Sequence, residues 1–177
     1  MKIFTYDHIT FPLPSGHRFP VEKYSLLRQR ITSENGLSGA ELRTPPSATI
    51  PQLQQAHTAE YVERVLNGRL SPGEIRRIGL PWSPELVERV RHSVGATTAV
   101  CRFALREGMA LSLGGGTHHA CRDEGQGFCV FNDVMVALRV MQAEGRLRRA
   151  LVVDCDVHQG NGTAEIARND DSIFTFS

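Results

Sequence analysis

From residue 109 onward, short apolar runs alternate with amphipathic stretches, and this alternation constrains the fold more than any other feature of the chain. The apolar runs have the length of strands and cover 109–113, 150–155 and 172–177, with helical stretches between them at 132–144 and about 163–168. Buried parallel strands joined by crossover helices produce this pattern. The sequence therefore predicts an α/β fold with a central parallel sheet.

The segment before residue 109 is expected to be mainly helical after one short strand. Residues 2–6 alternate apolar and polar side chains and predict that strand. Start signals and helical spacing predict helices at 21–31, 58–66 and 83–107, the last with an interruption near Gly95.

The strand predicted at 172–177 is rich in Ile and Phe and has no crossover helix after it. Such a strand would leave an apolar sheet edge exposed unless other residues pair with it. With no internal repeat and no low-complexity tract, residues 1–177 are expected to form a single domain that is only the front portion of a longer one.

Composition excludes several classes of protein and partner. A net charge of +1 gives no reason to expect direct binding to nucleic acid, and no apolar run approaches the length of a membrane span. The four cysteines show no C-x-x-C pairing, so a zinc ribbon or a secreted disulfide framework is not expected. We expect a cytoplasmic protein with reduced thiols; its oligomeric state, a homo-oligomer included, stays open.

A metal-binding pattern lies at the end of the strand predicted at 150–155. Alternate residues of a strand point to one side, so Asp154, Asp156 and His158 are expected to emerge together where ligands bind in open α/β sheets. Carboxylate oxygen and imidazole nitrogen are ordinary ligands of catalytic zinc. In isolation the same residues would as readily be turn and cap residues; the glycines at 160 and 162 favour a site.

Two adjacent histidines follow the preceding strand. His118 and His119 come directly after the three glycines at 114–116, which allow the backbone to turn sharply beneath a ligand. A neutral imidazole can take a proton from water and a neighbouring imidazolium can donate one, so the pair predicts general acid–base chemistry. Elsewhere in a chain, such a pair would more often lie on the surface.

A glycine- and aromatic-rich loop at 125–133 leads into the next helix, with Asn132 or Asp133 as its cap. Phe128 and Phe131 could both be core residues. The functional alternative is that Phe128 lines a narrow apolar channel for a long aliphatic side chain such as that of an acylated lysine.

Together these segments resemble the zinc-dependent histone deacetylase family, which includes acetylpolyamine amidohydrolases and acetoin-utilisation proteins. The resemblance rests on three motifs in order, Gly-Gly-Gly-Thr-His-His-Ala, Gly-Phe-Cys-Val-Phe-Asn-Asp and Asp-Cys-Asp-Val-His-Gln-Gly-Asn-Gly-Thr, and is continuous over about 109–177. The segment His57-x-x-Glu60-Tyr61 is similar to a pattern near the family's N-terminus. The resemblance implies an arginase-like three-layer fold, of which this chain would hold the N-terminal portion.

The resemblance also implies catalytic roles. Asp156 and His158 would be zinc ligands, His119 the general base, and His118 an electrostatic partner and proton donor with Asp154 behind it. The reaction implied is attack of metal-activated water on an amide carbonyl, which releases an acid and an amine. An acetylated lysine peptide, a polyamine or a small acetylated amine would be the substrate.

Two further groups follow from the same resemblance. Gly127 and Phe128 would form the channel for the acylated side chain. A structural monovalent cation, K⁺ or Na⁺, would be held at Asp154, Asp156, His158 and Ser177.

The sequence departs from the common family pattern in two ways. Asn161 stands where many members have a carboxylate partner for the second histidine, so it would orient His119 without stabilising the charged imidazole. The family's third zinc ligand and its carbonyl-polarising tyrosine would lie beyond Ser177.

Three functions therefore stay open. The first is a zinc-dependent deacetylase. The second is a catalytically weak or inactive deacetylase-like domain that serves as a binding or interaction module. A two-metal, arginase-type hydrolase is the third, and it is less favoured because paired histidines after three glycines suit a single metal.

Overall fold

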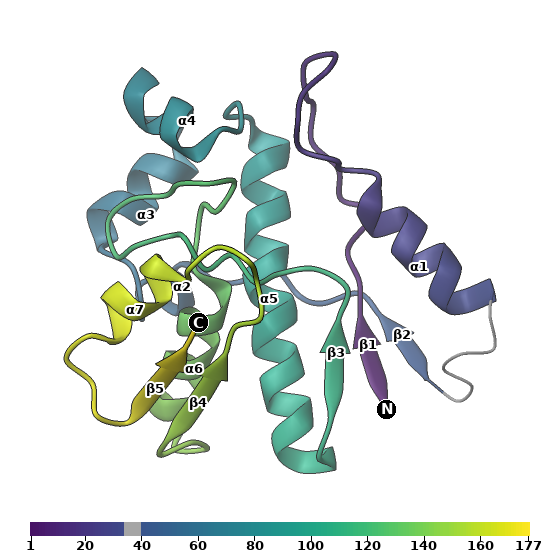
Figure 1. Cartoon of the computed structure of the whole chain (residues 1–177), viewed down its shortest axis with the longest axis vertical. Helices are drawn as coiled ribbons and strands as arrows, with labels where there is room; N and C mark the ends of the chain where they lie inside the picture. Colours follow the sequence, from purple (N-terminus) through teal and green to yellow (C-terminus); the bar gives the residue numbers. More distant parts are fainter. Residues whose placement is uncertain (34–39) are drawn as a thin grey trace.

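The computed structural model describes residues 1–33 and 40–177 and contains parallel β-strands flanked by helices (Figure 1). One sheet has the order β2-β1-β3, and a second pairs β4 with β5. Every pairing between these strands is parallel, as the sequence predicts. The strands are β1 (Lys2–Phe4), β2 (Glu41–Arg43), β3 (Ala110–Ser112), β4 (Ala150–Val153) and β5 (Ile173–Phe176).

The helices confirm each sequence prediction to within a few residues and add two short ones. They are α1 (Lys23–Ser33), α2 (Ile50–Leu53), α3 (Ala59–Leu66), α4 (Pro72–Ile78), α5 (Pro84–Glu107), α6 (Asp133–Ala143) and α7 (Asn161–Ala167). Among the described residues, no helix is long and apolar enough to cross a bilayer.

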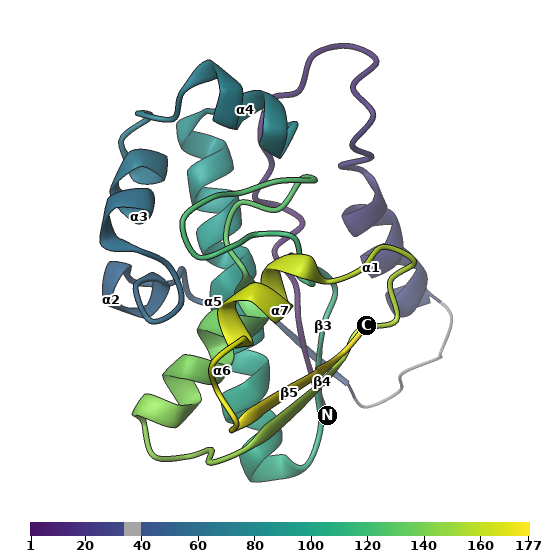
Figure 2. The same ribbon diagram turned by 60° about the vertical axis from the view of Figure 1, so that its left-hand side comes forward.

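The long helix α5 runs through the middle of the molecule, against α6 on one side and β1 and β3 on the other (Figures 1 and 2). The interruption expected near Gly95 is wrong, since the helix is continuous. A Cβ atom at this position would overlap the carbonyl oxygen of Pro46, so the glycine lets the 46–48 segment lie directly on the helix. Close packing therefore accounts for Gly95, and a break in the helix does not.

The main hydrophobic core lies where α3, α5 and α6 meet. Tyr61 is fully buried, and its hydroxyl donates a hydrogen bond to the carbonyl oxygen of Val130 at 2.8 Å. His57 is also buried and accepts a hydrogen bond at Nε2 from the backbone N–H of Asn132 at 2.9 Å. These two bonds attach the start of α3 to the loop that leads into α6.

A buried arginine joins α5 to the N-terminal strand. Arg89 is 5% exposed, and its Nη1 atom donates hydrogen bonds to the carbonyl oxygens of Tyr6 and Ile9 at 2.8 and 2.9 Å. Its guanidinium also lies over the rings of Tyr6 and Tyr24, at 4.4 and 4.2 Å from their centroids. Cation–π contacts and hydrogen bonds together offset the desolvation of the charge.

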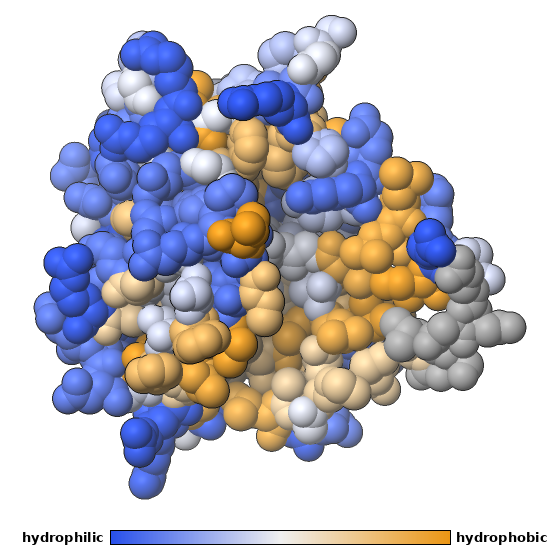
Figure 3. Space-filling view, viewed as in Figure 1, coloured by the Kyte–Doolittle hydropathy of each residue, from blue (hydrophilic) through white to orange (hydrophobic). Residues whose placement is uncertain are grey.

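The β4–β5 pair buries one face and exposes the other. Ile173 is buried in the main core, whereas Leu151 and its register partner Phe174 are 64% and 67% exposed. Phe176 is exposed on the same side, and Figure 3 shows apolar residues gathered over these strands. These strands therefore present an apolar face to solvent within the described residues, and the exposed sheet edge stays a prediction.

The strand predicted at 109–113 was expected to be buried, and this expectation is wrong. Leu111 is 37% exposed, and the sheet order places β3 at an edge. The apolar side chain of Leu111 therefore lies at a surface that the other described residues do not fully cover.

Candidate active site

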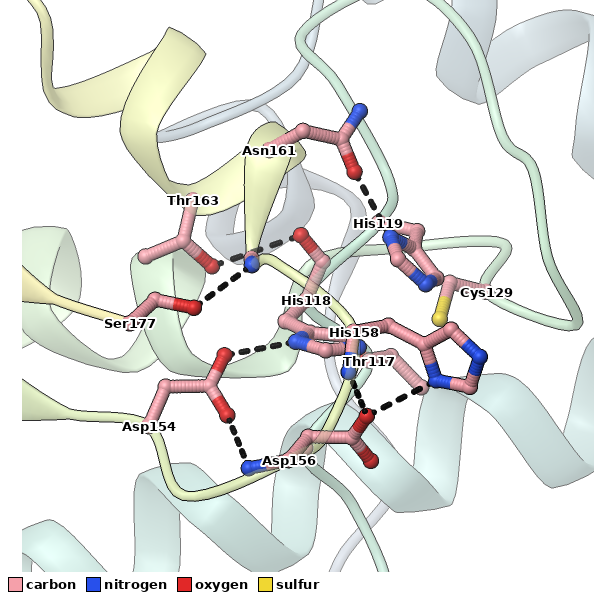
Figure 4. A network of polar contacts seen from close by, with 12 residues as sticks. Thr117, His118, His119, Cys129, Asp154, Asp156, His158, Asn161, Thr163 and Ser177 are labelled. Carbon is pink, nitrogen blue, oxygen red and sulfur yellow. Dashed lines mark hydrogen bonds and ion pairs between the residues drawn. The ribbon is translucent and has the colours of Figure 1, made fainter.

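The two loops with candidate catalytic residues meet beyond the C-terminal ends of β3 and β4 (Figure 4). The first loop carries His118 and His119, and the second runs from Asp154 to the start of α7. Thr163 of α7 donates a backbone hydrogen bond to the carbonyl oxygen of His118 at 3.0 Å. A Cβ atom at Gly162 would overlap the backbone of the histidine loop, so α7 lies directly on that loop.

Each histidine of the pair is held at Nδ1 by a side chain from the second loop or from α7. His118 Nδ1 lies 2.5 Å from Asp154 Oδ2, and His119 Nδ1 lies 2.6 Å from Asn161 Oδ1. Because both partner oxygens are acceptors, each Nδ1 carries the proton, and in the neutral ring Nε2 keeps its lone pair. The centroids of the two imidazole rings are 4.2 Å apart, so the rings lie side by side.

The sequence expectation that Asp154, Asp156 and His158 emerge together from one strand is wrong. β4 ends at Val153, and the following residues form a loop. Asp154 turns toward His118, and its other oxygen accepts a hydrogen bond from the backbone N–H of Asp156 at 3.0 Å. The Asp154 side chain is therefore mostly buried, whereas Asp156 and His158, which contact each other in Figure 4, are exposed.

Asp156 and His158 form an exposed carboxylate–imidazole pair. Asp156 Oδ1 accepts a hydrogen bond from the backbone N–H of His158 at 2.8 Å and lies 3.0 Å from its Nδ1 atom. The backbone bond, followed by the imidazole contact, holds the pKa of Asp156 below its usual value. The carboxylate is therefore ionised at neutral pH and available to a cation.

The chemistry of this pair fits two of the ligands of a zinc ion. Carboxylate oxygen and imidazole nitrogen are both common zinc donors, and the two side chains are 51% and 72% exposed, which leaves room for further ligands. Within residues 1–33 and 40–177, no group of three or more His, Cys, Asp or Glu side chains is arranged to hold a metal ion. The described residues thus offer two candidate ligands and no group of three.

Ser177 lies beside the same loop. Its Oγ atom accepts a hydrogen bond from the backbone N–H of Gly160 at 2.8 Å. The side chains predicted to hold a monovalent cation therefore come from one loop and from the residue directly after β5. The binding of K⁺ or Na⁺ by these side chains stays a prediction.

The loop with Gly127 and Phe128 borders the second histidine. A Cβ atom at Gly127 would lie 2.7 Å from Cδ2 of His119, so only a glycine allows this backbone to pass so close to the ring. Phe128 has a φ of 66°, in the left-handed region. Its ring packs against Phe19, with the centroids 5.4 Å apart, and is only partly buried. Gly127 thus lies at the candidate site. Phe128 follows it in the chain and packs against Phe19 of the N-terminal loop.

Cysteine chemistry is not suggested by the environment of Cys129, although this residue neighbours the site. Burial raises the pKa of its thiol to about 12, so the thiol stays protonated at neutral pH. All four cysteines are free in the structure, and their reduced state stays a prediction.

Sequence reasoning missed the contribution of Asp133 to this site. The start of α6 was expected to be capped by Asn132 or Asp133, and the side chain of Asn132 is the cap, at 3.0 Å from the backbone N–H of Met135. The carboxylate of Asp133 instead accepts hydrogen bonds from the loop that carries the histidines. The available signal was the carboxylate of Asp133 next to Asn132, which is sufficient as the cap.

Comparison with known proteins gives matches along nearly the whole chain. A sequence profile described as "Histone deacetylase domain" matches residues 17–177. An uncharacterised protein of Picosynechococcus is 41% identical over 97% of this chain and 57% of its own length. Histone deacetylase 2 of Arabidopsis thaliana is 27% identical over 96% of this chain and 46% of its own length. The acetoin utilization protein AcuC of Staphylococcus aureus is 29% identical over 91% and 44%, respectively.

Solved structures give the same fold. The crystal structure of an HDAC homologue from Aquifex aeolicus matches with a TM-score of 0.82 at 22% identity, over 98% of this chain and 49% of that one. An HDAC homologue complexed with SAHA matches with a TM-score of 0.81 at 23% identity, over the same shares. The arginase-like α/β fold is thereby confirmed, and the chain spans about half the length of the relatives it matches.

Proposed function

Because the chain belongs to the histone deacetylase family, we propose that it acts as a zinc-dependent amide hydrolase that removes acetyl or other acyl groups from lysine or a related amine. The observation that carries this proposal is the pair of imidazoles whose Nδ1 atoms are held by Asp154 and Asn161. That arrangement fixes both rings and leaves both Nε2 atoms for proton transfer.

Asp156 and His158 would hold the zinc ion, together with ligands that the described residues do not contain. Zinc, when bound, would make water more acidic and polarise the amide carbonyl. The carboxylate of Asp156 suits this role, because it is ionised at neutral pH and binds a cation without first losing a proton.

His119 is proposed as the general base. The hydrogen bond to Asn161 places the proton on Nδ1, so Nε2 can accept a proton from the attacking water. Its ring also lies 5.9 Å, centroid to centroid, from that of the proposed ligand His158. The base is therefore next to the proposed metal position.

His118 is proposed as the electrostatic partner and proton donor to the leaving amine. Its contact with Asp154 at 2.5 Å places a carboxylate behind the ring, which stabilises the imidazolium that proton donation requires. His118 is 8% exposed, so it is shielded from solvent more than His158.

The substrate class rests on the family and on the loop beside His119. Gly127 and Phe128 are proposed to border the acylated side chain, since the backbone of Gly127 lies against His119. An acetylated lysine peptide, a polyamine or a small acetylated amine remains the proposed substrate. We include a cytoplasmic location in the proposal, and the four free cysteines support it.

One observation favours a second candidate, a deacetylase-like domain that acts as an interaction module. The described residues offer two zinc ligands, whereas a catalytic zinc site ordinarily takes three from protein. Weak metal binding by this chain alone would make turnover slow or absent.

The deciding experiment is hydrolysis of an acetyl-lysine peptide by the 177-residue chain with added zinc, with a chelator, and by His119→Ala. The matched control is His8→Ala, because His8 is an exposed histidine of the N-terminal segment. Turnover that the chelator and His119→Ala abolish, and that His8→Ala keeps, supports the hydrolase. A folded chain without turnover overturns it for these 177 residues and favours the interaction module.

A further inference from the structure

A fully buried carboxylate lies beneath the histidine loop. The oxygens of Asp133 lie within hydrogen-bond distance of four donors, two backbone N–H groups and two hydroxyls. Oδ1 takes the N–H of Thr117 at 2.7 Å and lies 2.6 Å from the Thr117 hydroxyl, which it shares with the carbonyl oxygen of Phe131 at 2.5 Å. Oδ2 takes the N–H of Gly116 at 3.0 Å and the hydroxyl of Thr97 at 2.5 Å. Three of the four donors therefore belong to the two residues directly before His118.

The donors require a carboxylate at this position. Each oxygen of Asp133 faces a backbone N–H group, which can only donate. The amide of an asparagine has a single acceptor oxygen, so its NH₂ group would face an N–H and leave that donor unsatisfied. These donors compensate the burial of the Asp133 carboxylate.

The glycines of the loop are matched to this carboxylate. Gly115 and Gly116 have φ values of 109° and 71°, which favour glycine. A Cβ atom at Gly115 would overlap Oδ2 of Asp133. The loop thus wraps around the carboxylate and then continues directly into His118 and His119.

We propose that Asp133 is a positioning residue of the active site, which sets the direction of the backbone entering His118 and His119 and thereby aligns both imidazoles. The inference rests on the proposed hydrolase function and deepens it. Asp133 need not touch the substrate, because it acts through Gly116 and Thr117. A misplacement of about 1 Å at reacting groups can cost about 100-fold in rate.

The test compares Asp133→Asn with Asp170→Asn in the 177-residue chain. Asp170 also accepts hydrogen bonds from a backbone N–H and a hydroxyl, both of Ser172, but it lies in the turn before β5 and contacts neither histidine. Asp133→Asn should lower kcat by about 10- to 100-fold with KM changed less than about twofold, because alignment and not substrate binding is lost. Asp170→Asn should keep kcat.

A second readout does not depend on turnover. The ¹⁵N and ¹H resonances of the His118 and His119 rings, recorded at one fixed pH without substrate, should change in Asp133→Asn and stay as in the wild type in Asp170→Asn. Unchanged ring resonances in a folded Asp133→Asn chain would overturn the proposal. If the wild type shows no turnover, the hydrolase proposal fails, and these resonances still decide the role of Asp133.

Discussion

The Nδ1 atom of His119 lies 2.6 Å from the amide oxygen of Asn161, whereas the neighbouring His118 is held by the carboxylate of Asp154. The two imidazoles thus have partners of different charge. A neutral partner leaves His119 suited to accept a proton, and an anionic partner suits His118 to carry one. The proposed roles of His119 as base and of His118 as proton donor agree with this difference.

Changing Asn161 tests whether its amide orients His119. Asn161→Ala removes the hydrogen bond and is expected to lower kcat/KM by about 10- to 100-fold. Asn161→Asp keeps an acceptor for the Nδ1 proton, so it should retain more activity than Asn161→Ala. The measurement is kcat/KM for acetyl-lysine peptide at one fixed pH. Equal losses in the two variants would contradict an orienting role for Asn161.

Removing a proposed ligand should weaken zinc binding. His158→Ala is expected to lower zinc affinity by at least about 10-fold, because even the loss of a residue that only supports a ligand commonly has that effect. Competition with a chromophoric chelator measures the affinity without any turnover. His8→Ala, at an exposed histidine outside the site, should bind as the wild type does. Equal affinities for both variants would exclude His158 as a ligand.

Stability should depend on pH through His57. Burial lowers the pKa of this imidazole to about 4, below its usual value of about 6.5, so between these values the unfolded chain binds more protons. The free energy of unfolding should therefore fall as the pH drops from about 6.5 to 4, by up to about 3 kcal/mol from this residue. Urea unfolding across that range measures it.

The matched variant is His57→Gln, whose side-chain oxygen can still accept the bond from Asn132. It should lose less stability than the wild type over the same pH range. Identical losses would show that His57 is not the titrating group.

Two glycine substitutions test the packing of α5. Gly95→Ala should destabilise the fold by about 2 kcal/mol or more, because its Cβ atom would overlap the Pro46 carbonyl and force helix and loop apart. Gly73→Ala in α4 has no neighbour closer than 3.8 Å and should be neutral or stabilising by up to about 1 kcal/mol. Urea unfolding compares them; equal effects would contradict the close approach at Gly95.

The exposed face of β4 and β5 should make the chain self-associate. Phe174 and Phe176 are about two-thirds exposed beside Leu151, so the 177-residue chain should bind a hydrophobic dye and gain apparent mass with concentration. Phe174→Ser with Phe176→Ser should reduce both effects. Leu105→Ser, at an exposed leucine of α5, is the control. Analytical ultracentrifugation gives the mass, and no difference between the variants would contradict a role for this face.

The elements with strong periodicity were predictable from the sequence. α5 begins with Ser83 as its cap and Pro84 as its first residue, and both are plain start signals. α4 was missed because Ser71-Pro-Gly resembles a turn, although Ser71 and Glu74 form a capping box there. The strand β2 consists of three exposed residues with no apolar alternation to reveal it.

The candidate site was predictable in its residues and less so in its geometry. The loop carrying His119 and the start of α7 with Asn161 do meet, although β3 and β4, which precede them, belong to different sheets. The expectation that alternate residues of a strand point to one side did not hold for Asp154, because β4 ends at Val153. The backbone changes direction after the strand, so Asp154 and Asp156 point to different sides. The bond between Asp133 and Gly116 joins residues 17 positions apart through a turn, which no local pattern specifies.

The parallel pairing of β1 with β3 has a consequence for synthesis on the ribosome. The register partners of β1 (Lys2–Phe4) in β3 are Ala110 to Ser112, so β1 is synthesised more than a hundred residues before this neighbouring strand. Contacts so distant in sequence form slowly, so the assembly of this sheet is expected to limit the folding rate.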